Sequence, residues 1–215
     1  MERIKYPRTF HLPFSERAIH DDKILPSLEP FKGQATVITE KYDGENTTIY
    51  SDGYVHARSM EHNKHPGRTY VSKVAAQLKG ELPEGWRICG ENLQARHTIV
   101  YENLPDWFLA YSIWDDKNNC LPWVDFCIWC TLLGIHHVRT IKEFFTFDED
   151  EVKKLVEEIR NPGIEGFVIR NRKGFHYNDF SKNVCKFVYK HFVIPAELWM
   201  YKPVILNGRE DNKEK

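Results

Sequence analysis

The 215-residue sequence lacks the segments that would direct it to a membrane or out of the cell. No apolar run approaches the ~20 residues that a membrane-spanning helix needs. The first residues, MERIKYPRTF, contain no apolar segment of the kind that a secretory signal has. There is also no internal repeat and no low-complexity linker. We therefore expect a cytoplasmic protein with one substantial domain, because the chain is too short for two domains of ordinary size.

An excess of charge of either sign is also missing. The chain has 30 Lys and Arg against 31 Asp and Glu, a formal net charge of −1. This balance disfavours a passive nucleic-acid-binding protein, whose affinity comes from a global positive charge, although a local basic groove is not excluded. Hydrophobic residues make up 41% of the chain, which is enough for a core and atypical of disordered proteins.

The five cysteines lack the second pair of ligands that a structural zinc site needs. Cys127 and Cys130 form one CxxC inside the apolar run WVDFCIWCTLLGI. Zinc usually takes four ligands in two spaced pairs. We therefore expect this motif to belong to a buried helical face rather than to a metal site. The thiols are expected to be free, as in the reducing cytosol.

The hydrophobic patterns predict an α+β fold with hairpin-like links. Apolar residues from Val152 to Ile159 recur at helical spacing, and Thr146 with Glu149 fits a capping box at the start of that helix. Two further helices are predicted at 69–79 and 123–133. Runs rich in β-branched and aromatic residues predict strands at 35–40, 47–51, 54–58, 86–91, 108–114, 165–170 and 184–189.

Three segments are expected along the chain. Residues 1–34 are rich in proline and charge and predict an irregular arm that packs on the domain. The domain itself is expected to span residues 35–203. The chain ends in the polar stretch NGREDNKEK, so residues 204–215 are expected to form a flexible tail.

The segment EKYDGENTTIY, residues 40–50, interrupts two strand-like runs with a charged lysine. Taken alone, Lys41 and Asp43 most simply form a solvated turn. The alternative is that Lys41 is a nucleophile held within reach of a substrate. An ordered series of motifs favours the nucleophile: HARS carries Arg58, CGENLQAR carries Glu91, WFLAYSIWD carries Tyr111, IEGFVIR carries Glu165, and VCKFVYK carries Lys186 and Lys190.

This ordered set resembles the covalent nucleotidyltransferases, which include ATP-dependent DNA and RNA ligases and mRNA capping enzymes. The amino-acid sequence around the motifs, over residues 36–195, is most similar to that of the RNA ligases. The resemblance implies a nucleotidyltransferase domain, the ATP-grasp-like adenylation domain of ligases, with antiparallel sheets and flanking helices. It also implies ATP, Mg²⁺ or Mn²⁺, and an RNA substrate with 5′-phosphate and 3′-hydroxyl ends. Too few residues lie outside the motifs for an OB-fold domain, so none is expected.

The resemblance also implies a role for each motif residue. Lys41 would attack the α-phosphorus of ATP, for which the amine must lose its proton although its ordinary pKa is about 10.4. Nearby cations, with Lys186 and Lys190 as candidates, and a bound metal are expected to lower that pKa. The other expected contacts are Glu40, Asp43 and Gly44 beside Lys41, Arg58 at a phosphate, Glu91 at a ribose hydroxyl, Tyr111 under adenine and Glu165 at the metal. Phe108 is the alternative for the stacking position, and a contact from Lys190 to the nucleotide stays open.

Other functions fit parts of the same pattern. Within the enzymes, a DNA ligase or a capping guanylyltransferase is the alternative, and from another class a nucleotide-binding module without turnover. For an RNA end, phosphate contacts are expected from Arg58, Lys64 and Arg68, and such contacts carry no sequence information. Binding of this kind is weak and sensitive to salt, so sealing is expected to depend on a partner protein or a guiding duplex.

Overall fold

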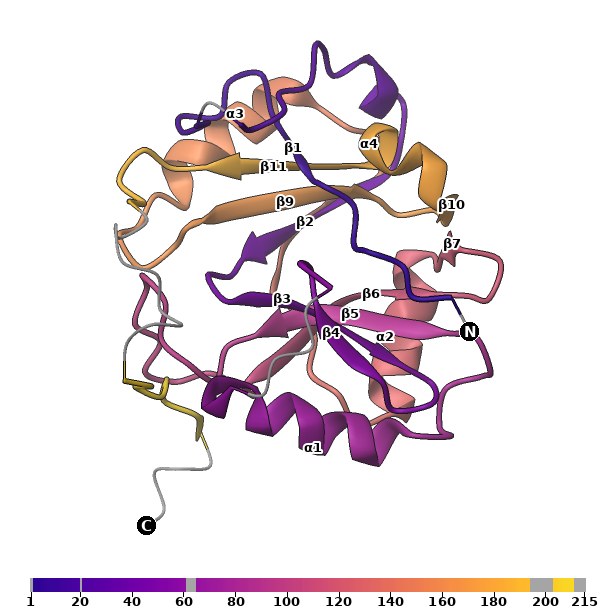
Figure 1. The fold of residues 1–215 in the computed structure, drawn as a ribbon. Coiled ribbons are helices and arrows are strands. Elements are labelled where there is room, and N and C mark those ends of the chain that lie inside the picture. Colours follow the sequence, from indigo (N-terminus) through magenta and orange to yellow (C-terminus); the bar gives the residue numbers. More distant parts are fainter. Residues whose placement is uncertain (1, 20, 61–64, 194–202, 211–215) are drawn as a thin grey trace.

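Two β-sheets lie one above the other, and helices cover their outer sides (Figure 1). The protein is represented by a computed structural model that describes residues 2–19, 21–60, 65–193 and 203–210. The expected α+β class, with antiparallel sheets and flanking helices, is confirmed. Within the described residues, no helix is both long enough and apolar enough to cross a membrane.

The upper sheet in Figure 1 packs against helix α3 (Glu149–Glu158). Val152 and Val156 of α3 share a buried core with Phe167 and Phe187 of the sheet, because the apolar residues of the helix recur on one face. All strand pairs are antiparallel except β1 with β11. In spatial order the strands are β1 (Phe10–His11), β11 (Val184–Val188), β9 (Gly166–Asn171), β2 (Thr36–Lys41) and β8 (Thr140–Phe144).

The lower sheet packs against helices α1 (Thr69–Leu78) and α2 (Trp123–Leu132). Val74 of α1 and Phe126 of α2 meet Ile88 of the sheet in a second buried core. All pairs in this sheet are antiparallel. In spatial order the strands are β10 (Phe175–His176), β7 (Asn119–Cys120), β6 (Phe108–Trp114), β5 (Arg87–Asn92), β3 (Glu45–Tyr50) and β4 (Val55–Ala57).

The predicted strand runs correspond to β2, β3, β4, β5, β6, β9 and β11, and the predicted helices to α1, α2 and α3. The strand runs predicted at 35–40 and 47–51 are not joined by a hairpin-like link. Strand β2 pairs with β8 and β9 in the upper sheet, whereas β3 pairs with β4 and β5 in the lower one. Residues 42–44 therefore carry the chain from one sheet to the other.

The start of α3 differs from the predicted capping box. The N-cap is Asp148, whose Oδ1 accepts a hydrogen bond from the backbone N of Glu151 at 3.0 Å. The box of Thr146 and Glu149 is therefore wrong. The same spacing of a capping residue and a glutamate recurs two residues later, and Asp148 has the extended backbone that an N-cap needs.

Both ends of the described chain contribute to the fold. Leu12, Leu25 and Phe31 of the N-terminal arm are buried in the core beneath α3. Near the other end, Asn207 is 2% exposed, and its side-chain amide donates to the carbonyl of Leu93 at 2.8 Å. Residues 205–210 hydrogen-bond to residues 94–104, so the expectation of a flexible tail does not hold for them.

The CxxC lies on α2, as expected. Cys130 is buried and Cys127 is partly exposed, and both are free thiols. Cys89, Cys120 and Cys185 are also free and buried. Burial raises the pKa of Cys130 to about 12, so this thiol stays protonated at neutral pH.

Candidate active site

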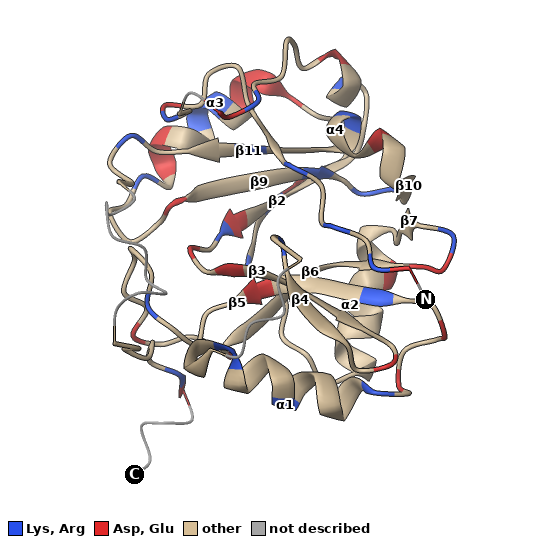
Figure 2. Cartoon of the chain, in the orientation of Figure 1, with Lys and Arg blue, Asp and Glu red and all other residues tan. Residues whose placement is uncertain are grey.

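A cavity of about 310 Å³ lies between the two sheets. One wall comes from β2, β9 and β11, and the other from β3, β5 and β6. Acidic and basic residues meet at the end of β2 and beside β3 and β5, where the sheets face each other (Figure 2). Of the residues expected at the nucleotide, those that line the cavity are Glu40, Lys41, Gly44, Arg58, Glu91, Tyr111 and Lys186.

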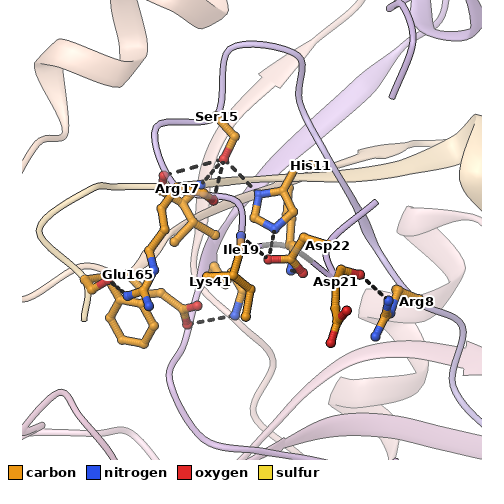
Figure 3. Close-up of polar contacts among 12 residues, drawn as sticks. Arg8, His11, Ser15, Arg17, Ile19, Asp21, Asp22, Lys41 and Glu165 are labelled. Carbon is orange, nitrogen blue, oxygen red and sulfur yellow. Dashed lines mark hydrogen bonds and ion pairs between the residues drawn. The ribbon is translucent and has the colours of Figure 1, made fainter. Parts of the chain in front are cut away.

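Lys41 is the last residue of β2, and its ammonium faces a buried carboxylate (Figure 3). Its Nζ lies 2.7 Å from Oε2 of Glu165, because β2 and β9 pair with Lys41 opposite Gly166. Burial lowers the pKa of Lys41, but the nearby carboxylates, Glu165 first among them, raise it more. The net direction is upward, so the nearby cations do not outweigh the carboxylates. In this arrangement the amine is held protonated.

Glu165 is fixed by close packing at the start of β9. A Cβ at Gly166 would lie 1.9 Å from the carbonyl oxygen of Phe187, so only glycine permits this approach of β9 to β11. The backbone N of Tyr189 donates to the carbonyl of Glu165 at 3.0 Å. Burial raises the pKa of the Glu165 carboxyl, and the charge of Lys41 only partly offsets this. The result is a rigid carboxylate beside the lysine.

Glu91 projects from β5 towards the same lysine. Its Oε1 accepts a hydrogen bond from the backbone N of Gly44 at 3.2 Å. Burial raises the pKa of Glu91 to about 8, against the lowering effect of Lys41. Gly44 does not have a positive φ, so its backbone conformation does not require glycine. It permits close packing instead, since a Cβ there would lie 2.5 Å from the carbonyl oxygen of Asn92.

Asp43 does not line the cavity but fixes the crossing between the sheets. Its Oδ2 accepts hydrogen bonds from the backbone N of Thr98 at 2.6 Å and of Ile99 at 2.8 Å. Its own backbone N donates to the hydroxyl of Tyr101 at 2.8 Å. Asp43 therefore positions the segment after Lys41, and the structure does not bring its carboxylate into the cavity wall.

The two aromatic residues considered for stacking lie in different places. Tyr111 lines the cavity, and its hydroxyl accepts a hydrogen bond from the side-chain amide of Asn46. Burial raises the pKa of this hydroxyl well above its usual range. Phe108 is fully buried in the core of the lower sheet, against Gly90. Only Tyr111 is therefore placed to meet a ligand in the cavity.

The remaining charged candidates of this region have different surroundings. Arg58 follows β4 and lines the cavity, held by its backbone N, which donates to the carbonyl of Asn46 at 3.1 Å. The carboxylate of Glu40 accepts from Nε of Arg139 at 2.8 Å. Of the residues expected at an RNA end, Arg68 pairs with Glu45, and Lys64 lies outside the described residues.

The two lysines of the last motif are separated by the structure. Lys186 lies on β11 and lines the cavity, with its Nζ 3.7 Å from Oδ1 of Asp22. Burial lowers the pKa of Lys186, and the neighbouring charge of Lys41 lowers it further. Lys190 is exposed beyond β11, is not part of the cavity wall, and donates from its backbone N to Glu16 at 3.1 Å. The structure thus brings Lys186, and not Lys190, to Lys41.

Sequence reasoning missed the contribution of the N-terminal arm. Tyr6, Arg8 and Asp22 line the cavity, and the ring of Tyr6 lies 5.1 Å from that of Tyr111 in an edge-on contact. These residues carry no motif, and only the tertiary structure brings them to the site. Arg170 was also missed, although it ends the motif IEGFVIR. Its guanidinium lines the cavity and donates to the carbonyl of Tyr111 at 2.9 Å.

The motifs fall within the range that matches one known protein family. The family model described as RNA ligase matches residues 34–188, which is more than half of the chain. The chain belongs to the RNA ligase family. This confirms the family expected from the motifs, all of whose candidate residues except Lys190 fall within the matched range. The arm residues at the cavity lie outside it.

Solved structures of RNA ligases share the fold of this family member. An RNA ligase from Naegleria gruberi without ligand has a TM-score of 0.56 at 19% identity, over 86% of this chain and 57% of that one. The same ligase with ATP and Mn has a TM-score of 0.55 at 16% identity, over 88% and 61%. An archaeal ATP-dependent RNA ligase has a TM-score of 0.55 at 18% identity, over 77% and 45%. This chain therefore spans about half the length of these relatives. A comparison with curated proteins gave no match.

Proposed function

We propose that this RNA ligase family member is an ATP-dependent RNA ligase that works through a covalent lysyl–AMP at Lys41. The observation that carries the proposal is that Lys41 and Lys186 line one cavity while Glu165 pairs with Lys41, all three inside the range that matches the family. A reactive amine next to a carboxylate and a second cation is the arrangement that nucleophilic attack on a phosphate requires. The similar Naegleria ligase with ATP and Mn supports ATP as the co-substrate.

The reaction has three steps. In the first, Nζ of Lys41 attacks the α-phosphorus of ATP. A nitrogen–phosphorus bond forms, the α–β phosphorus–oxygen bond breaks, pyrophosphate leaves and the amine gives up its proton. In the second, an oxygen of the RNA 5′-phosphate displaces Lys41 and takes AMP. In the third, a 3′-hydroxyl attacks that 5′-phosphate, which forms the phosphodiester and releases AMP.

Charge around Lys41 controls the first step. Because the carboxylates raise the pKa of Lys41, their charge has to be offset before the amine loses its proton. Lys186 contributes to this, since the two neighbouring ammonium groups disfavour each other. Within the described residues, no three His, Cys, Asp or Glu side chains form a complete metal site. In this proposal Glu165 would hold Mg²⁺ or Mn²⁺ together with phosphate oxygens, the ligands that these cations prefer. When bound, such a cation offsets negative charge at the phosphates.

The cavity walls suggest how the nucleotide is seated. The volume of about 310 Å³ is at the lower end of the range for small-molecule sites. In this proposal adenine stacks on Tyr111, Glu91 accepts from a ribose hydroxyl, and Arg58 donates to a phosphate. Glu40 and Gly44 line the same wall as Lys41. Asp43, Glu165 and Lys190 are not part of the wall, and Glu165 reaches the site through its ion pair with Lys41.

The setting of the reaction is also part of the proposal. The substrate is RNA with 5′-phosphate and 3′-hydroxyl ends, sealed by an adenylation domain of the ATP-grasp-like ligase type, with a partner protein or a guiding duplex to help recognise the ends. The five free thiols support a reducing compartment, which we take to be the cytoplasm. Of Arg58 and Arg68, the described residues expected at an RNA end, Arg58 is the one that lines the cavity.

Adduct formation and sealing together test the function. The protein is incubated with Mg²⁺ and either ATP or GTP, and its intact mass is measured. A gain of one AMP with ATP alone supports the ligase, a gain with GTP indicates a capping-type enzyme, and no gain indicates a binding module. Sealing is then measured from a pre-adenylated 5′ end at a nick whose terminal 3′ residue is a ribo- or a deoxynucleotide. Equal rates would indicate a DNA ligase, because only the 2′-hydroxyl separates the two ends.

A further inference from the structure

The N-terminal arm lies outside the range that matches the RNA ligase family, yet it holds an acidic side chain against Lys186. We propose that Asp22, oriented by His11, positions Lys186 for the adenylylation of Lys41. Asp22 is in this sense a positioning residue that acts through the lysine. The inference rests on the proposed function and assigns to it residues that no motif contains.

The backbone of the arm brings the three residues together. Strand β1 runs parallel to β11, with His11 opposite Lys186. The arm then doubles back, because the backbone N of His11 donates to the carbonyl of Lys23 at 2.7 Å and the backbone N of Leu25 donates to the carbonyl of His11 at 2.9 Å. This return places Asp22 beside both His11 and Lys186.

The two carboxylate oxygens of Asp22 have different partners (Figure 3). Oδ2 accepts a hydrogen bond from the backbone N of Ile19 at 3.1 Å and lies 3.2 Å from Nε2 of His11. Oδ1 lies 3.7 Å from Nζ of Lys186. Burial opposes ionisation, but these contacts together keep the pKa of Asp22 below its ordinary value. One oxygen is thus anchored by the arm, and the other is left for the lysine.

His11 orients Asp22 without neutralising it. The ring is 1% exposed, and burial, followed by the charge of Lys186, lowers its pKa to about 4. The imidazole is therefore neutral near pH 7. Nδ1 lies 2.9 Å from the hydroxyl of Ser15, and Nε2, which has no hydrogen-bond partner among the described residues, lies in close contact with Oδ2 of Asp22. The negative charge of Asp22 remains available to Lys186.

The order Ser15, His11, Asp22 resembles a hydrolytic triad, but the surroundings of the serine are those of a structural residue. Its hydroxyl accepts a hydrogen bond from the backbone N of Val188 at 3.0 Å, and it does not line the cavity. Asp22 and Lys186 do line it. The network therefore points towards Lys186. A lysine side chain is long and flexible, and a fixed carboxylate limits the positions that its ammonium adopts before it meets the phosphate.

The test compares two neighbouring substitutions, Asp22→Asn and Asp21→Asn. Asp21 is exposed and does not line the cavity, so its substitution removes the same charge without touching Lys186. Formation of lysyl–AMP is followed by intact mass in single turnovers. We expect Asp22→Asn to slow the step about tenfold at saturating ATP, with the half-saturating ATP concentration changed little, because misplacement of a charged group acts mainly on the transition state. Asp21→Asn should match the wild type.

A double-mutant cycle shows whether Asp22 acts through Lys186. In the Lys186→Ala background, Asp22→Asn should cause no further loss of rate. A loss of the same size in both backgrounds would overturn the proposal, as would a normal rate for Asp22→Asn alone. An equal loss in Asp21→Asn would also overturn it, because the effect would then come from the charge or fold of the arm and not from the contact with Lys186; so would a rate loss in Asp22→Asn that is matched by a much lower melting temperature.

A second measurement does not depend on activity. Lysines of the nucleotide-free protein are labelled with an amine-reactive reagent over a range of pH, and Lys186 is quantified by peptide mass spectrometry. Lys186 also faces Lys41, Glu165 and Arg58, which are the same in all variants. Loss of the carboxylate should lower the pKa of Lys186 and speed its labelling in Asp22→Asn only. Unchanged labelling overturns the inference, whereas a wild-type protein that gains no AMP overturns the proposed function.

Discussion

Two groups of residues around the cavity, the lysine end and the aromatic end, differ in the kind of side chain that they contain. The lysine end holds Lys41 and Lys186 of the cavity wall, together with Glu165, which pairs with Lys41 behind that wall. The aromatic end holds Tyr111 and Tyr6, whose rings pack edge-on. Buried charges near a reacting phosphate affect the transition state, whereas a flat ring binds a base equally throughout the reaction. We therefore expect the lysine end to determine the rate of adenylylation and the aromatic end to determine the affinity for the nucleotide.

The largest effect is expected at the nucleophile. Lys41→Ala removes the only atom to which AMP is proposed to attach, so the mass gain after incubation with ATP and Mg²⁺ should disappear. Lys173→Ala serves as the control, because Lys173 is exposed and does not line the cavity. If the Lys41→Ala protein still gains one AMP, another residue is the nucleophile and the lysine end has been assigned wrongly.

The other two charges of the lysine end should each affect the rate strongly. Glu165→Ala and Lys186→Ala should slow adenylylation by about 10²–10³ at saturating ATP, since a preorganised charge at a reacting phosphate is worth about that much. Single-turnover kinetics measure the rate, and thermal melting serves as the control for folding. A variant that melts much earlier than the wild type would show that its residue is needed for the fold instead.

The aromatic end should show the opposite kinetic behaviour. Tyr111→Ala should raise the KM for ATP about tenfold or more, because stacking of a base on an aromatic ring contributes ~1–3 kcal/mol. The rate at saturating ATP should change little. Tyr111→Phe keeps the ring and loses only the hydrogen bond from Asn46, so it should bind ATP nearly normally. A collapse of kcat with a normal KM would erase the distinction between the two ends.

The motifs predicted some of the residues that meet at the site. Lys41, Glu165 and Lys186 are far apart in the chain, and their resemblance to a known pattern predicted a shared site that the structure assembles. Tyr6 and Asp22 could not be predicted, because they reach the cavity only through the pairing of β1 with β11. That strand has two residues, too few to give a periodic pattern.

Other differences also have physical causes. The crossing after Lys41 resembles a hairpin in sequence because two β-rich runs flank a short polar segment. Which strands pair is decided by distant partners, such as β9 for β2. The direction of the pKa shift of Lys41 does not follow from the sequence, because it depends on the number of carboxylates that the fold gathers around the amine. The sequence shows which charged residues are present, but not how many of each sign lie next to the Lys41 amine in the folded protein.

The smallest expected effect concerns stability and the carboxylate on the opposite wall. Burial raises the pKa of Glu91 from 4.5 to about 8 in the folded protein. Between these values the folded state binds more protons than the unfolded state, so the stability of the wild type falls as the pH rises through this window. Glu91→Gln removes this titration and keeps an acceptor for the backbone N of Gly44.

The difference in melting temperature between Glu91→Gln and the wild type should therefore grow in favour of the variant from pH 5 to pH 8. Because the side chain is partly exposed, we expect only about 1 kcal/mol, or ~2–4 °C for a protein of this size. Glu84→Gln, at an exposed glutamate, should show no such trend. Parallel melting curves for Glu91→Gln and the wild type at both pH values would mean that Glu91 is ionised in the folded protein. The carboxylate would then already be charged when a ribose hydroxyl reaches it.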